Sequence, residues 1–80
     1  MPNKAIHSLT QAKAGATFTL AEIHGGKEIV RRLVELGLTP GVHLRKLQDA
    51  GGPVILAIRD SRIALGRGMA EKLFVFEEDR

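Results

Sequence analysis

Three histidines and one glutamate are the residues of this sequence whose chemistry best suits metal binding. They are His7, His24, His43 and Glu22. Glu22 precedes His24 by two positions, so both side chains share one face if this stretch is a strand. No two histidines have the close spacing of a preformed tetrahedral site, and the chain has no cysteine. We therefore predict no metal site and no bound cofactor in the monomer.

Residues for covalent or phosphate chemistry are equally sparse. No serine stands in a glycine-rich elbow, and without cysteine there is no thiolate nucleophile. The stretch Gly25-Gly26-Lys27 is too short to cradle a phosphate and lacks a following Ser or Thr. The sequence predicts no catalytic residue, and we expect a protein that is not an enzyme.

Two adjacent arginines, Arg31 and Arg32, could contact an anionic partner. Glu28 precedes Arg32 by four positions and Glu35 follows Arg31 by four, so the same charges also fit a solvated helix face. Both interpretations stay open, and we treat the arginine pair as a candidate partner-binding site.

These side chains need a scaffold, and its clearest element is a helix predicted over residues 26–36. At 100° per residue the apolar side chains of this stretch fall in one arc, opposite the charged ones. They are Ile29, Val30, Leu33, Val34 and Leu36. We expect this arc to be buried, with the helix packed across one opening of a small barrel.

The end of this helix is marked by glycine and proline. Gly37 suits the left-handed position after the last turn, and Leu38 can fold back onto Leu33 in a Schellman motif. Residues 39–42, Thr-Pro-Gly-Val, then fit a type II turn.

Around the helix the pattern predicts short strands. We expect them at residues 17–24, 42–48, 54–58, 63–65 and 72–76, with a short helical turn near 8–12 and a loop or one helical turn over 66–71. The apolar face switches midway in the first two strands, which indicates bulges and strong curvature. The strand 54–58 is apolar on both faces and is predicted to be the most central.

This order of elements predicts a fold class. We expect a mainly β, small α+β domain: a five-stranded SH3-like barrel with one principal α-helix and short helical turns. An OB-like barrel is the main alternative.

The last strand carries the second candidate partner-binding site. Leu73 and Val75 alternate with Phe74 and Phe76. If the first pair faces the core, the two phenylalanines face outward and form a patch that monomers seldom leave bare. The alternative is that the N-terminal segment covers them.

Composition limits the function classes. The 80 residues fit one domain, spanning 1–80, with a thin core. The absence of cysteine and of an apolar run of about 18 residues favours a cytoplasmic protein without membrane insertion. Twelve basic residues are offset by nine acidic ones, and three phenylalanines are the only aromatic residues, so we expect no nucleic-acid partner.

Several short motifs, spread from Leu9 to Val75, resemble the ferrous-iron transport protein A (FeoA) family. They are Arg32-Leu33, Leu36-Gly37-Leu38, Pro40-Gly41, Pro53-Val54, Ile63-Ala64-Leu65, Ala70, Leu73 and Val75. The most specific part is the run R-L-x-x-L-G-L-x-P-G, joined to a later I-A-L strand. That family resembles SH3-like barrels and is similar to the C-terminal domains of some iron-dependent repressors.

The resemblance implies a small cytosolic accessory protein that acts on ferrous-iron transporter B, a membrane protein with a cytosolic GTP-binding domain. It implies no catalytic residues. Phe74 and Phe76 depart from the family pattern and could mark a modified contact surface. A nucleic-acid-binding small barrel and a detached SH3-like domain related to iron-dependent repressors are the alternatives, and weak self-association is left open.

Overall fold

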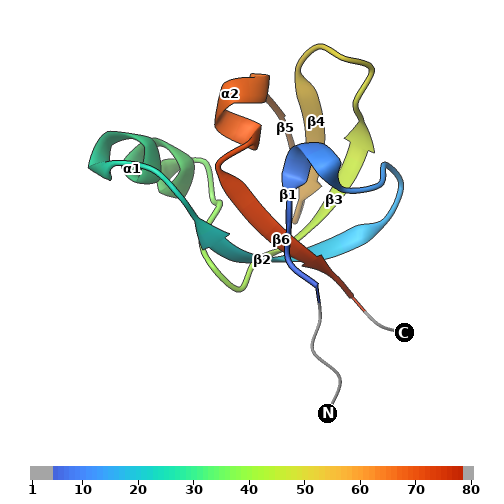
Figure 1. The fold of residues 1–80 in the computed structure, drawn as a ribbon, viewed down its shortest axis with the longest axis horizontal. Helices are drawn as coiled ribbons and strands as arrows, with labels where there is room; N and C mark the ends of the chain where they lie inside the picture. The colour runs from blue at the N-terminus through green and yellow to red at the C-terminus, as the bar shows by residue number, and fades with distance from the viewer. Residues whose placement is uncertain (1–4, 79–80) are drawn as a thin grey trace.

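The computed structural model describes residues 5–78, so residues 1–4 and 79–80 of the expected domain lie outside the described part. One curved antiparallel sheet is accompanied by two α-helices and a 3-10 turn (Figure 1). The strands are β1 His7–Ser8, β2 Thr17–Ile23, β3 His43–Gln48, β4 Val54–Ile58, β5 Ser61–Leu65 and β6 Leu73–Glu77. The helical elements are η1 Leu9–Gln11, α1 Lys27–Glu35 and α2 Arg67–Ala70.

The sheet has the strand order β1-β6-β2-β3-β4-β5. The mainly β, SH3-like fold class is confirmed, and the two-residue β1 is added to the five expected strands. The predicted central position of strand 54–58 is wrong, because β4 lies next to the edge strand β5 while β2 and β3 are central. The apolar residues on the outer face of β4, Ile55 and Ala57, are only half-buried. Apolar residues on both faces of a strand therefore do not show that the strand is central.

Bulges in the two central strands bend the sheet around its core. The register shifts between Leu20 and Glu22 in β2 and between Lys46 and Gln48 in β3. Both shifts confirm the bulges predicted from the switching apolar face. The inner face is filled by buried side chains from all the longer strands, among them Phe18, Leu20, Leu44, Val54, Leu56, Leu65, Leu73 and Val75.

The predicted caps and turns are confirmed. Gly37 has a φ of 94°, and the N–H of Leu38 donates to the carbonyl of Leu33 at 2.9 Å, which closes α1 in a Schellman motif. In the following turn the N–H of Val42 donates to the carbonyl of Thr39 at 3.0 Å. The two predicted helical turns are η1 and α2.

The burial predicted for α1 is largely wrong. Of its apolar arc only Leu33 is fully buried, while Ile29 and Val30 are half-buried. Val34 and Leu36 are 42% and 44% exposed. Figure 1 gives the reason, since α1 lies to one side of the sheet and nothing within residues 5–78 forms a second layer over its remaining apolar side.

Candidate partner-binding surfaces

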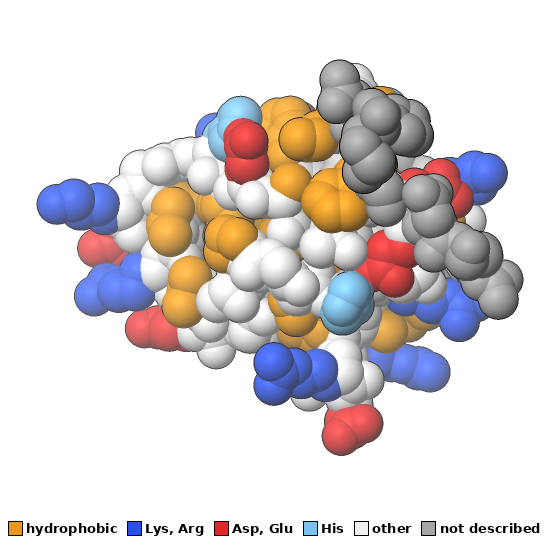
Figure 2. All heavy atoms as spheres, turned by 90° about the horizontal axis from the view of Figure 1, so that it is seen from below, with side chains coloured by type: hydrophobic (Ala, Val, Ile, Leu, Met, Phe, Trp, Pro, Cys, Tyr) orange, Lys and Arg blue, Asp and Glu red, His pale blue; other side chains and the backbone are white. Residues whose placement is uncertain are grey.

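Two of the three histidines, His24 and His43, each pair with an acidic residue. His24 Nε2 lies 2.6 Å from Glu22 Oε1, confirming that these two side chains share a face. His43 Nδ1 pairs with Glu78, which also accepts a hydrogen bond from Thr19 Oγ1 at 2.8 Å. Figure 2 shows histidine side chains beside acidic ones on the exposed surface.

No metal cluster is found in the part of the chain that the structure describes. There, no group of three His, Cys, Asp or Glu side chains is placed to hold an ion. His7 lies on β1, and His24 stacks on the ring of Phe74 with centroids 4.2 Å apart. His24 and His43 therefore act as local hydrogen-bond partners, and His24 also as a stacking partner. The absence of a metal site stays a prediction.

Phe74 and Phe76 lie on the outer face of β6, as their alternation with Leu73 and Val75 predicted. Leu73 and Val75 are fully buried, whereas both phenylalanines are half-buried. The N-terminal strand β1 pairs with β6 and places Ser8 opposite Phe74, and the His24 ring covers Phe74 further. The N-terminal segment and His24 thus leave part of each ring surface open for contact.

Arg31 and Arg32 are both exposed on α1. Arg31 Nη2 lies 3.2 Å from both carboxylate oxygens of Glu28, so the pair formed is i,i+3. The expected i,i+4 pairing of Glu28 with Arg32 is replaced by this contact, because one carboxylate serves the nearer arginine. Exposed pairs of this kind contribute little to stability, so the arginines remain available to a partner.

The apolar face of α1 carries two exposed side chains, Val34 and Leu36, at opposite ends of its arc, and Leu36 lines a hollow that sequence patterns did not reveal. The hollow has a volume of about 340 Å³. Its lining comes from the C-terminal end of α1 and from the turn between β4 and β5: Leu36, Gly37, Thr39, Ile58, Arg59 and Ser61. Figure 2 shows hydrophobic side chains at the surface over α1, beside charged ones.

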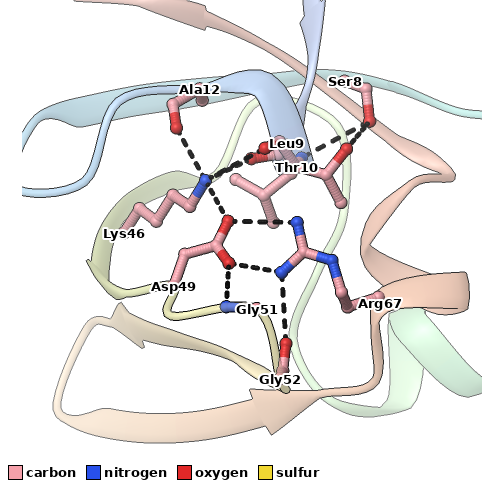
Figure 3. A network of polar contacts seen from close by, with 9 residues as sticks. All are labelled: Ser8, Leu9, Thr10, Ala12, Lys46, Asp49, Gly51, Gly52 and Arg67. Carbon is pink, nitrogen blue, oxygen red and sulfur yellow. Dashed lines mark hydrogen bonds and ion pairs between the residues drawn. The ribbon is translucent and has the colours of Figure 1, made fainter.

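In contrast to these exposed apolar side chains, one charged side chain, Lys46, is buried inside the barrel. Lys46 is 2% exposed, and its ammonium donates to the carbonyls of Leu9 at 2.9 Å and Ala12 at 2.6 Å (Figure 3). Lys46 Nζ also lies 2.8 Å from Asp49 Oδ2. Every proton of the ammonium therefore has an acceptor, which is the condition under which a charge can be buried.

Arg67 completes this network from α2. Its guanidinium meets the Asp49 carboxylate with both terminal nitrogens and donates to the carbonyl of Gly52 at 3.2 Å. The hydrogen bonds from Arg67, and next those from Lys46, hold the pKa of Asp49 well below its usual range, and Asp49 in turn raises the pKa of Arg67. We call Lys46, Asp49 and Arg67 the charged network. It joins η1, β3, the β3–β4 loop and α2, and it positions these elements.

Sequence reasoning missed the charged network, although one signal was present. Lys46 has the same parity in its strand as the buried Val42 and Leu44, so it lies on the inner face. Its partners Asp49 and Arg67 are 18 positions apart in a loop and a short helix, and no spacing rule joins them.

Among the described residues, no helix has both the length and the apolar character needed to cross a membrane.

Comparison with known proteins gives consistent matches. The FeoA domain family matches residues 7–76. A protein of Methanocaldococcus jannaschii named as an Fe(2+) transport protein A is 36% identical over 70 residues, covering 88% of this chain and 85% of that protein.

Solved structures agree with this match. The crystal structure of an iron uptake regulatory protein (FeoA) has a TM-score of 0.87 and 29% identity, covering 92% of this chain and all of that one. A FeoA protein from Chlorobium tepidum has a TM-score of 0.80 and 26% identity, covering 90% of this chain and 70% of that one. A manganese-dependent transcriptional repressor has a TM-score of 0.84 at 23% identity, over 98% of this chain and 45% of the repressor, which shows a shared fold.

Proposed function

Because this chain belongs to the FeoA domain family, we propose that it serves ferrous-iron uptake by binding ferrous-iron transporter B. The role of this family in ferrous-iron transport supports a function in iron uptake. Transporter B as the partner is what the resemblance of the motifs implies. In this proposal the chain acts in the cytoplasm, on the side where the GTP-binding domain of the transporter lies. It modulates the transporter as an accessory protein and carries out no catalytic step of its own.

One observation carries the proposal at the level of the molecule: the exposed apolar face of α1. Val34 and Leu36 leave more than two-fifths of their surface to solvent. Leu36 also lines a hollow large enough to receive a partner side chain. Exposed apolar side chains near a concave site are typical of protein interfaces, whose energy comes from a few buried anchors. Arg31 and Arg32 on the same helix supply a charged rim.

The test measures binding of the purified chain to purified cytosolic fragments of the transporter, including its GTP-binding domain. Val34→Ser and Leu36→Ser should each weaken binding by at least about 1 kcal/mol, because each removes an apolar anchor. The thermal midpoint should barely move, since both side chains are exposed. Ile6→Ser is the matched control for α1 alone, because Ile6 is 47% exposed and lies in the segment before β1, on the side of β6.

Phe74 and Phe76 are the second proposed contact. Phe74→Ser and Phe76→Ser should weaken binding by at least about 1 kcal/mol if the outer face of β6 takes part. Binding lost only in these variants would move the interface from α1 to β6. Failure of the wild-type chain to bind any transporter fragment would overturn the partner assignment.

A further inference from the structure

The β5 strand forms an open edge of the sheet. It pairs with β4 alone, and within residues 5–78 no backbone hydrogen bond joins it to another strand. Its residues Arg62 and Ala64 are exposed. Ile63 faces inward like Leu65, yet it remains half-exposed because no strand follows on that side. The other edge strand, β1, has only two residues, so β5 is the longer open edge.

The hairpin geometry tells which backbone groups point away from β4. Ile58 and Ser61 flank a two-residue loop, so they form a hydrogen-bonded pair. Hydrogen-bonded and non-bonded pairs alternate along an antiparallel ladder, which makes the pairs of Arg62 with Ala57 and of Ala64 with Ile55 non-bonded. The N–H and C=O groups of Arg62 and Ala64 therefore point outward from the sheet edge.

Two arginines without acidic partners lie at this edge: Arg62 in β5 and Arg59 in the turn before it. Arg59 and Arg62 form no ion pair or side-chain hydrogen bond within the described range, and Asp60 between them pairs with neither. Arg59 has a φ of 50°, a left-handed conformation unfavourable for a residue with a side chain. It also lines the hollow, together with Ser61 at the start of β5. A strained arginine is thus held where the open edge meets the hollow.

We propose that the β5 edge binds an extended segment of another protein as a seventh strand, and that this segment reads apolar, acidic, apolar. A strand added beside β5 pairs with the outward groups of Arg62 and Ala64. Its residue opposite Arg62 lies on the outer face, where a carboxylate pairs with the guanidinium. Its two neighbours face inward: one covers Ile63, and the other, opposite Ser61, enters the hollow.

The charges favour this occupant over a second copy of the chain. Two β5 edges paired around a two-fold axis at Arg62 would place the two Arg62 side chains opposite each other, which is unfavourable. An axis at Ile63 would place Arg62 opposite Ala64, which gives the guanidinium no carboxylate. Only an axis at Ser61 would place Arg62 opposite Asp60, and Asp60 lies in the turn, outside the strand Ser61–Leu65. A nucleic acid is less well matched, because the outward positions of this edge are Arg62 and Ala64 and offer no aromatic ring for stacking. The inference does not depend on transporter binding, and its test uses no transporter.

The test uses the ¹⁵N-labelled full chain and the peptide acetyl-Gly-Thr-Val-Glu-Leu-Thr-Gly-amide. Strand addition should slow amide hydrogen exchange at Arg62 and Ala64, because these two N–H groups gain acceptors. Replacing Glu by Lys in the peptide should weaken binding by about three- to ten-fold. Arg62→Glu should weaken binding of the Glu peptide similarly and should restore binding of the Lys peptide.

Two matched variants separate strand addition from general attraction of an acidic peptide. Arg45→Glu makes the same charge change on β3, two strands away in the same cross-strand row, and should leave binding within about two-fold. Ala64→Pro removes one outward N–H and should abolish the slowed exchange at Arg62, whereas Ala64→Thr keeps the N–H and the binding.

If Ala64→Pro does not fold, comparing Arg62→Glu with Arg45→Glu still distinguishes binding at the β5 edge from general attraction of an acidic peptide. Equal weakening by Arg45→Glu and Arg62→Glu would overturn the proposal in favour of diffuse attraction. Chemical-shift changes without slowed exchange at Arg62 and Ala64 would overturn strand addition. Dimerisation through β5, or binding of a duplex oligonucleotide that competes with the peptide more strongly than unlabelled peptide does, would assign the edge to a different occupant.

Discussion

The charged network is buried, whereas the apolar face of α1 is exposed, so the two regions reverse the usual placement of side chains. Lys46 is almost completely enclosed, and each polar atom around it is paired. Val34 and Leu36 touch solvent over a large part of their surface. The charged network is therefore complete within the chain, whereas the apolar face of α1 leaves surface that another molecule could cover.

Loss of the Lys46 charge should have the largest effect on the free energy of unfolding, because it opens the charged network. Lys46→Met leaves Asp49 without one partner and removes the Lys46 donor from the carbonyls of Leu9 and Ala12, of which that of Leu9 keeps the N–H of Ala12. Breaking a buried ionic network on one side costs about 3–5 kcal/mol. We expect a fall of that size in the free energy of unfolding, measured by urea denaturation.

The matched control for this prediction is Lys13→Met. Lys13 is exposed, so the same chemical change there should alter the free energy of unfolding by less than about 0.5 kcal/mol. Equal effects of the two variants would mean that the buried amine contributes nothing specific to the fold.

The second prediction compares the buried Leu33 with the exposed Leu36, at the end of the same helix. Leu33→Ala should cost about 2–5 kcal/mol, because Leu33 is fully buried and its truncation leaves a cavity. Leu36→Ala on the same helix is the control, since its side chain is 44% exposed and should cost far less. A denaturation midpoint unchanged by Leu33→Ala would contradict the place of this residue in the core.

These two regions also show how far the sequence could predict the structure. Local rules placed the end of α1 correctly, because the φ preference of Gly37 and the fold-back of Leu38 depend on neighbouring residues. The switch of apolar face located the bulges for the same reason. Period and parity concern one element at a time, and these features were predicted well.

What could not be predicted depends on which elements lie next to each other. Periodicity gives α1 one apolar arc, but it does not tell that the sheet covers Leu33 completely and leaves Leu36 largely exposed. In the same way, the contact of Asp49 with Arg67 requires α2 to be folded beside the β3–β4 loop. The position of β4 beside an edge strand is also a property of the whole sheet.

The third prediction tests the charged network by pH. The pKa of folded Asp49 lies below the value of about 3.9 for an unfolded chain, chiefly because Arg67 donates to its carboxylate. Its contribution to stability is therefore fully present above about pH 4 and is lost as the pH falls towards the folded-state pKa.

The measurement follows from this sign. The difference in unfolding free energy between the wild type and Asp49→Asn should be constant from about pH 7 to 5 and should shrink below about pH 4. Asp60→Asn, which removes an exposed carboxylate outside the network, is the matched control. A difference as large at about pH 2.5 as at pH 7 would show that Asp49 acts through its shape and hydrogen bonds alone.

The smallest expected effect concerns Arg59, which stands where the apolar face of α1 meets the open β5 edge. Its φ of 50° is unfavourable for arginine, and asparagine tolerates this region better. Arg59→Asn should therefore raise the free energy of unfolding by about 0.5–1 kcal/mol, measured by chemical denaturation. Arg62→Asn is the control, because Arg62 lies in a regular strand with a negative φ and offers no strain to relieve. A gain in stability on losing Arg59 would mean that the chain carries this arginine at some cost to its fold, as expected of a residue whose charge serves a partner. A loss of stability would instead give Arg59 a structural role in the turn, and the case for a binding edge would then depend on Arg62 and the hollow.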